Sequence, residues 1–93
     1  MAVTYLMLAR LPEGALGDFD AYESAVLPLL AEYGGRLERR LRTLDDRVEA
    51  HVITFPDNEH LAAYRADPRR SAAAPLLESS GAAVELLEVR DVQ

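Results

Sequence analysis

Arg40 and His51 carry the side chains best suited to acid–base chemistry in this chain. An imidazole beside a guanidinium stays neutral, because a nearby positive charge disfavours protonation, and a neutral imidazole can accept a proton. The two-pronged guanidinium can bind a carboxylate or an enolate oxygen. We therefore predict Arg40 and His51 as catalytic residues. The structural alternative is an ion pair of Arg40 with Glu38 or Glu49, and a packed or interface histidine at position 51.

Aromatic side chains supply the predicted substrate-binding wall. A tyrosine offers a flat apolar face and a hydroxyl group that can polarise a carbonyl or donate a proton. Tyr22 and Tyr64 fall on helix faces that turn toward a sheet, and Phe55 continues an apolar floor beside the polar pair. We assign these three residues to substrate binding, against the alternative that each is an ordinary core residue.

Composition excludes several classes of function. The 93 residues include no cysteine, which excludes thiolate metal sites, disulfides and cysteine catalysis. A net charge of −6 has the wrong sign for a nucleic-acid-binding surface. No apolar run approaches the ~20 residues that span a bilayer, and no secretory signal is recognised. We therefore expect a cytoplasmic protein with no nucleic-acid or membrane partner.

The sequence predicts no metal site and no cofactor. Its two histidines, His51 and His60, lie on different elements, without ligand-spaced carboxylates on a shared face. Gly34-Gly35 ends a helix instead of following a strand, so it is not a phosphate-binding loop. We interpret His60 and the pair Arg69-Arg70 as solvated surface side chains.

Hydrophobic periodicity predicts the order strand, helix, strand, strand, helix, strand. The predicted strands cover residues 3–10, 35–44, 47–55 and 82–92. Two such halves joined by a central hairpin predict one α+β domain over residues 1–93. Its fold would be ferredoxin-like βαββαβ, with two helices on one face of a four-stranded antiparallel sheet.

The boundaries of the helices are marked by caps and prolines. Asp18 is a candidate cap of the first helix, Pro28 predicts a kink within it, and the glycine pair ends it. Asp57 caps the second helix, and Asp67 followed by proline restarts the chain. The segment after Pro68 is expected to be short or irregular, because Pro75 interrupts it.

The central hairpin has a register that can be worked out from its turn. If the turn is symmetric about Asp45-Asp46, the opposing pairs are Arg39 and Val52, Arg40 and His51, Leu41 and Ala50, and Arg42 and Glu49. One face then carries Leu37, Leu41, Val48, Ala50 and Val52, and the other carries Glu38, Arg40, Arg42, Glu49, His51, Ile53 and Phe55. A polar cluster beside an apolar floor is the usual composition of a small-molecule pocket.

The face of the sheet without helices should also be apolar, because the first, third and last strands carry apolar residues on both sides. An exposed apolar face of that size indicates an interaction surface. Since symmetric dimers are the commonest oligomers, we predict a homodimer whose sheets face each other, a dimeric α/β barrel.

Several motifs resemble the DUF1330 family, which belongs to the dimeric α/β-barrel superfamily. The similarity covers most of the chain and rests on Tyr33-Gly34-Gly35-Arg36, Phe55-Pro56 and Ala62-Ala63-Tyr64, with Arg40 late in the second strand. The resemblance implies this fold. It assigns no reaction, because the superfamily includes cofactor-independent monooxygenases of antibiotic biosynthesis, muconolactone isomerases, haem-using peroxidases and effector-binding domains.

Two functional hypotheses remain from the sequence. In the first, a cofactor-independent enzyme of monooxygenase or isomerase type acts on a carbonyl or aromatic compound. Arg40 then holds an oxyanion, and His51 or a tyrosine moves the proton. In the second, the protein is a non-catalytic dimer that binds a small ligand or assembles with partner chains. A cleft reached by Arg40 and His51 would favour the first.

Overall fold

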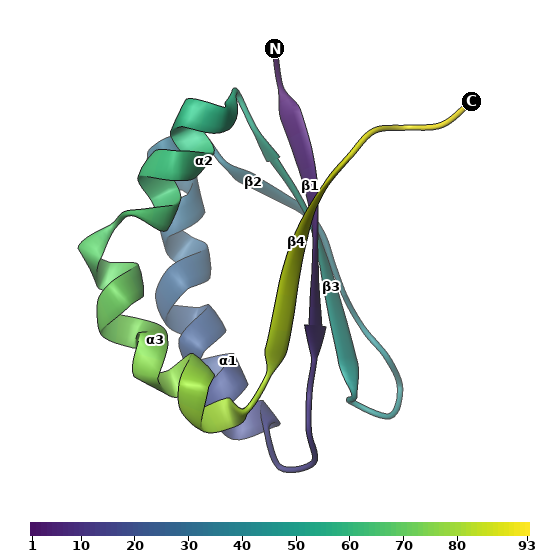
Figure 1. The fold of residues 1–93 in the computed structure, drawn as a ribbon, viewed down its shortest axis with the longest axis vertical. Coiled ribbons are helices and arrows are strands. Elements are labelled where there is room, and N and C mark those ends of the chain that lie inside the picture. The colour runs from purple at the N-terminus through teal and green to yellow at the C-terminus, as the bar shows by residue number, and fades with distance from the viewer.

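The chain forms a four-stranded antiparallel sheet with all its helices on one face (Figure 1). The computed structural model describes residues 1–93. The strands are β1 (Val3–Arg10), β2 (Arg36–Arg42), β3 (Val48–Phe55) and β4 (Ala83–Val89), in the order β2-β3-β1-β4. The helices are α1 (Leu16–Val26), the 3₁₀ helix η1 (Leu27–Tyr33), α2 (Asn58–Arg65) and α3 (Pro68–Ser80). The predicted ferredoxin-like α+β fold is confirmed.

The first helix differs from its prediction at both ends. It begins at Leu16, so Asp18 lies in its first turn and does not cap it. The Asp18 carboxylate instead accepts a hydrogen bond from Ser79 Oγ at 2.6 Å, which links α1 to α3. The predicted kink at Pro28 takes the form of a change to 3₁₀ geometry, because proline cannot donate the next α-helical hydrogen bond.

The second helical region is more regular than predicted. Asp57 and Asp67 cap α2 and α3 as expected, accepting from the amides of His60 at 2.9 Å and Arg69 at 2.7 Å. However, α3 runs without a break through Pro75, so the expectation of a short or irregular segment is wrong. Its buried Ala73 packs against Tyr22 and Val26 of α1, and packing of this kind supplies most of the stability of a helix in a protein.

The predicted hairpin register is confirmed over four pairs and shifts beyond them. Arg39, Arg40, Leu41 and Arg42 lie opposite Val52, His51, Ala50 and Glu49. A β-bulge at Glu38 then pairs Leu37 with Ile53. Leu37 therefore packs against the core beneath the helices, and its predicted place on the other face is wrong.

The paired glycines allow η1 to pack closely on the sheet. Gly34 has φ 71°, the left-handed conformation expected where a helix ends. A Cβ on Gly35 would lie 2.7 Å from the ring of Phe55, so only glycine fits there.

The two faces of the sheet have different environments. The face toward the helices carries the main core, with Met7, Ala9, Ile53 and Phe55 buried against Phe19, Leu29 and Leu30. The opposite face is open to solvent and still apolar: Leu41, Leu87 and Val89 are 45%, 43% and 37% exposed. None of the helices is both long and apolar enough to cross a membrane.

Candidate active site

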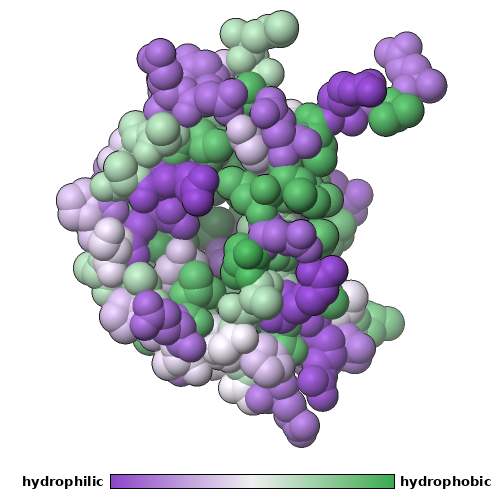
Figure 2. All heavy atoms as spheres, viewed as in Figure 1, coloured by the Kyte–Doolittle hydropathy of each residue, from purple (hydrophilic) through white to green (hydrophobic).

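A cavity of about 340 Å³ lies between the sheet and the helices. Figure 2 shows a hollow in the molecule around which hydrophobic residues gather. Sixteen residues line the cavity, and twelve of them are hydrophobic, so the polar members are few: Glu23, His51, Arg65 and Arg70. An apolar chamber of this volume with a few polar groups is typical of small-molecule sites, at the small end of their range.

Four of the five predicted site residues line this cavity. His51 reaches it from β3 together with Phe55, while Tyr22 and Tyr64 reach it from α1 and α2. Tyr22, Phe55 and Tyr64 are all buried, and the Tyr64 hydroxyl donates to the Val26 carbonyl at 3.2 Å. The structure thus brings together the predicted proton-accepting group and the predicted aromatic wall.

Arg40 does not line the cavity. It borders a separate, open surface depression of about 480 Å³ together with Asp20 and Arg42. Its Nε donates to Glu49 Oε2 at 3.0 Å, and its Nη2 lies 3.5 Å from Asp20. This is the ion-pair alternative of the sequence analysis, and it separates Arg40 from any ligand in the cavity.

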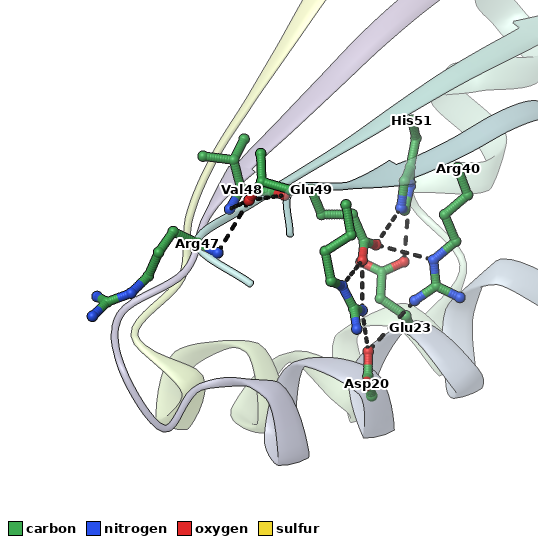
Figure 3. Close-up of polar contacts among 9 residues, drawn as sticks. Asp20, Glu23, Arg40, Arg47, Val48, Glu49 and His51 are labelled. Atoms are coloured by element: carbon green, nitrogen blue, oxygen red, sulfur yellow. Dashed lines mark hydrogen bonds and ion pairs between the residues drawn. The ribbon is translucent and has the colours of Figure 1, made fainter. Parts of the chain in front are cut away.

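Glu49 is the centre of a buried network on the β2–β3 hairpin (Figure 3). Its carboxylate is only 1% exposed, and it accepts from Arg40, from Arg42 Nε at 2.8 Å and from His51 Nε2 at 2.6 Å. Burial raises the pKa of Glu49, but the hydrogen bonds from His51, Arg42 and Arg40 outweigh burial, so the pKa lies below its usual value. Glu49 is therefore a fixed negative charge.

This network sets the protonation state of His51. Burial lowers the pKa of His51, and the charges of Arg40 and Arg42 lower it further, while the bond to Glu49 offsets this only in part. A neutral imidazole that donates from Nε2 to Glu49 has its lone pair on Nδ1. That nitrogen lies 4.0 Å from Glu23 Oε2, which is too long for a direct hydrogen bond. The arrangement leaves Nδ1 free to accept a proton.

Glu23 is the carboxyl group on the cavity side of this histidine. It comes from α1, is 4% exposed, and its carboxyl group has no hydrogen-bond partner. Burial and the negative charge of Glu49 raise its pKa from 4.5 to about 7. A carboxyl group with that pKa, lining an apolar cavity, is suited to accept and return a proton at neutral pH.

Sequence analysis missed Glu23, although a signal was present. The buried residues of α1 are Phe19, Tyr22, Glu23 and Val26, so a carboxylate occupies the apolar stripe that packs on the sheet. Acidic residues are rarely buried without a partner, and one at such a position indicates a function.

Arg70 was also misinterpreted, since the prediction placed it in solvent. It is half-buried and lines the cavity, where its Nη2 donates to the Tyr22 hydroxyl at 3.0 Å. Its guanidinium carbon lies 4.6 Å from the centre of the Tyr64 ring, a cation–π contact. The neighbouring Arg69 does lie outside the cavity, paired with Glu32 and Asp67.

Glu23, Glu49 and His51 also form a group with metal-ligand chemistry, since their ligand atoms lie within 4.8 Å of one another. The sequence analysis found no carboxylate at ligand spacing beside a histidine, because it did not include Glu23, which α1 brings against Glu49 and His51 of β3. Arg40 and Arg42 already neutralise Glu49, and two guanidinium groups beside a site oppose the binding of a cation. The cluster fits proton transfer better than metal binding.

Comparisons with known proteins show that the chain is similar to several solved structures. Neither a protein-family model nor a curated protein sequence matches the chain, so the resemblance to DUF1330 is not confirmed. Among solved structures, the cofactor-independent oxygenase SnoaB from Streptomyces nogalater is similar, with a TM-score of 0.75 and 20% identity over 98% of this chain and 95% of that one.

Two further structures are similar over most of their length. A dimeric ferredoxin-like protein of unknown function from Jannaschia sp. CCS1 has a TM-score of 0.67 and 24% identity, over 92% of this chain and 99% of that one. A NIPSNAP family protein from Agrobacterium tumefaciens has a TM-score of 0.68 and 16% identity, over 94% of this chain and 91% of that one. At these identities the likeness shows that the chain shares their ferredoxin-like fold.

Proposed function

We propose that this protein is a cofactor-independent enzyme that removes a proton from an aromatic or enolisable carbonyl compound bound in the cavity. Glu23 is the general base, and the neutral His51 lies beside it, with Nδ1 4.0 Å from Glu23 Oε2. Tyr22, Tyr64 and Phe55 form the wall against which the substrate ring packs. Arg40 takes a different role from the one first predicted, since it acts on Glu49 and through Glu49 on His51.

The observation that carries this proposal is the buried, unpaired carboxyl group of Glu23 at the cavity wall. A general base works best when its pKa lies near the working pH, and the pKa of Glu23 is raised to about 7. The substrate would lose its proton to the Glu23 carboxylate and become a carbanion or an enolate. The apolar wall excludes water and so strengthens the electrostatic interactions within the site.

Molecular oxygen is the proposed second reactant. It would add to the carbanion to give a peroxide, and loss of water from that peroxide leaves a carbonyl group. In this balance a CH₂ group and O₂ give C=O and H₂O, so no cofactor is required. The structural likeness to a cofactor-independent oxygenase supports this choice. Isomerisation, in which Glu23 returns the proton to another carbon, shares the first step.

The proposal is tested with polycyclic phenols and ketones in two assays. The first measures oxygen uptake, and the second measures exchange of the acidic C–H for deuterium in D₂O. The unmodified protein should catalyse exchange, and Glu23→Gln should lose it. Glu78→Gln, which removes an exposed carboxylate of α3, is the matched control. Binding of these compounds without exchange or oxygen uptake contradicts the proposal and favours a non-catalytic ligand-binding protein.

The homodimer and the cytoplasmic location also stand as proposals. The exposed apolar face of the sheet, with Leu87 and Val89 on β4, supports sheet-to-sheet association. Light scattering should give twice the mass of the chain, and Leu87→Glu should reduce it to the mass of one chain. Leu44→Glu, in the hairpin turn, should leave the dimer intact. A single-chain mass for the unmodified protein would overturn the dimer.

A further inference from the structure

Arg70 is a cation without a negatively charged partner at the cavity wall. Among the arginines of this chain, Arg40, Arg42 and Arg69 each form ion pairs with carboxylates, whereas Arg70 forms none. Of the five N–H donors of its guanidinium, only Nη2 has a hydrogen-bond partner, the hydroxyl of Tyr22. Its Nε is buried and has no partner. Such a donor is rare in native structures and calls for an explanation.

The position of Arg70 is nevertheless fixed. The Tyr22 hydroxyl holds one end of the guanidinium, and the Tyr64 ring lies beneath it at 4.6 Å. The other cavity arginine, Arg65, is exposed and has no ion pair or side-chain hydrogen bond. An arginine held in place by packing loses little conformational freedom when it binds a ligand. Arg70 is thus the better anchor of the two.

The charge balance of the cavity points in the same direction. The chain has a net charge of −6, yet the cavity wall carries two guanidinium groups and a single carboxyl group, with a neutral histidine. This concentration of positive charge in an acidic protein favours an anionic ligand. Apart from these groups the wall is hydrophobic and aromatic, which favours a ring system.

We infer that the ligand of this cavity is an aromatic carboxylate. Its carboxylate group pairs with Arg70, and its ring packs against the aromatic wall formed by Tyr22, Tyr64 and Phe55. This inference rests on the proposed function and names the class of its substrate. Arg70 is then a specificity residue: it selects the anionic compound and orients the ring relative to Glu23. A guanidinium binds a carboxylate through two parallel hydrogen bonds, which fixes orientation as well as affinity.

The test compares an acid with its neutral ester. The probes are 1-hydroxy-2-naphthoate and its methyl ester, a bicyclic pair suited to a cavity of about 340 Å³. Isothermal titration calorimetry measures both dissociation constants for the unmodified protein and for Arg70→Met and Arg70→Lys. Arg36→Met removes the same charge from an exposed arginine of β2 outside the cavity, and it is the matched control.

The unmodified protein and Arg36→Met should bind the acid at least about 10-fold more tightly than the ester. Arg70→Met should weaken binding of the acid by roughly 10- to 100-fold, the usual loss for a charge-assisted hydrogen bond, and leave the ester unchanged. Arg70→Lys should retain part of the preference, because it keeps the charge without the second hydrogen bond.

Equal binding of acid and ester by the unmodified protein overturns this inference. It leaves the proposed function standing, since proton abstraction by Glu23 needs no anionic group. A preference for the acid that survives in Arg70→Met also overturns it. If Arg70→Met does not fold, the acid-to-ester ratio of the unmodified protein and of Arg70→Lys still decides the question. Absence of binding for both probes, with no deuterium exchange in any compound, overturns the inference and the proposed function together.

Discussion

The two carboxyl groups on either side of His51 show how surroundings assign different roles to the same side chain. Both Glu49 and Glu23 are almost completely buried. Glu49 lies on the hairpin, where two arginines and the histidine donate to it, and its pKa is lowered. Glu23 lies on α1 and faces the cavity without a hydrogen-bond partner, and its pKa is raised to about 7. One carboxylate is a permanent charge that holds the histidine, and the other can exchange a proton.

The two carboxyl groups also have opposite effects on the stability of the fold. The network around Glu49 contributes to the stability of the fold, because each charge in it has a partner. A buried carboxyl group without partners reduces stability whenever it ionises, since burial penalises the charged form. A buried, unpaired carboxyl group of this kind indicates a function. The first variants to examine therefore replace each of the two residues by glutamine.

The largest expected effect is on catalysis. Glu23→Gln should lower the rate of deuterium exchange by roughly 10²- to 10⁴-fold, the usual contribution of a general base. Glutamine has the same shape and cannot accept the proton. The rate is measured by NMR in D₂O on the compound that the protein turns over, with Glu78→Gln as the control. An unchanged rate would show that Glu23 does not differ in role from an ordinary buried carboxyl group.

Glu49→Gln should act mainly on stability. Breaking a buried ion pair costs about 3 to 5 kcal/mol, and we expect the low end because both arginines are partly exposed. The free energy of unfolding is measured by urea titration. Glu23→Gln should show no such loss under the same conditions. A greater loss in Glu23→Gln than in Glu49→Gln would reverse the comparison.

The contributions of Glu23 and Glu49 to stability change in opposite directions with pH. The folded-state pKa of Glu23, about 7, lies above 4.5, so the folded state keeps a proton that the unfolded state releases. The contribution of Glu23 to the free energy of unfolding therefore falls as the pH rises from 4.5 to 7, by about 3 kcal/mol in total. The pKa of Glu49 is lowered, so its contribution is present above the usual glutamate pKa and is lost as the pH falls.

The measurement is a series of urea titrations between pH 4.5 and pH 8. Glu23→Gln should gain stability relative to the unmodified protein as the pH rises across this range. If the difference in free energy of unfolding between the two proteins stays constant with pH, Glu23 has the ordinary pKa of a glutamate in the folded protein.

The smallest expected effect concerns Arg40, whose side chain is 39% exposed. Arg40→Gln should cost about 1 kcal/mol, because Arg42 and His51 still donate to Glu49 and solvent screens the lost pair. It should also raise the pKa of His51, since one nearby positive charge disappears. Thermal unfolding and an NMR titration of the imidazole measure the two effects. A loss as great as that of Glu49→Gln would indicate that Arg40 alone holds the network.

The fold could be predicted from the sequence because its pattern is local and repeated. Alternation along the strands, the two glycines after Tyr33 and the aspartate caps at 57 and 67 each act within a few residues. The hairpin register followed from the turn as far as Arg39. It failed at Leu37, because a bulge at Glu38 depends on how the strand meets η1 and the core.

The site was only partly predictable, because it depends on contacts between distant elements. His51, Tyr22, Tyr64 and Phe55 were identified from their faces on strands and helices. Arg70 was not, because α3 was expected to be irregular after Pro68, and a helix was needed to bring its guanidinium over Tyr64. The role of Arg40 depended on Glu49, whose carboxylate is buried only after the chain folds and α1 covers the sheet.

The central claim is that the carboxyl group of Glu23 exchanges a proton near neutral pH in the folded protein. The most direct test is an NMR titration of protein labelled with ¹³C at the glutamate side chains, with Glu23→Gln used to assign the resonance. We predict that the Glu23 carboxyl signal titrates with a midpoint near pH 7, well above 4.5, the ordinary pKa of a glutamate. A midpoint near 4.5 would contradict the account.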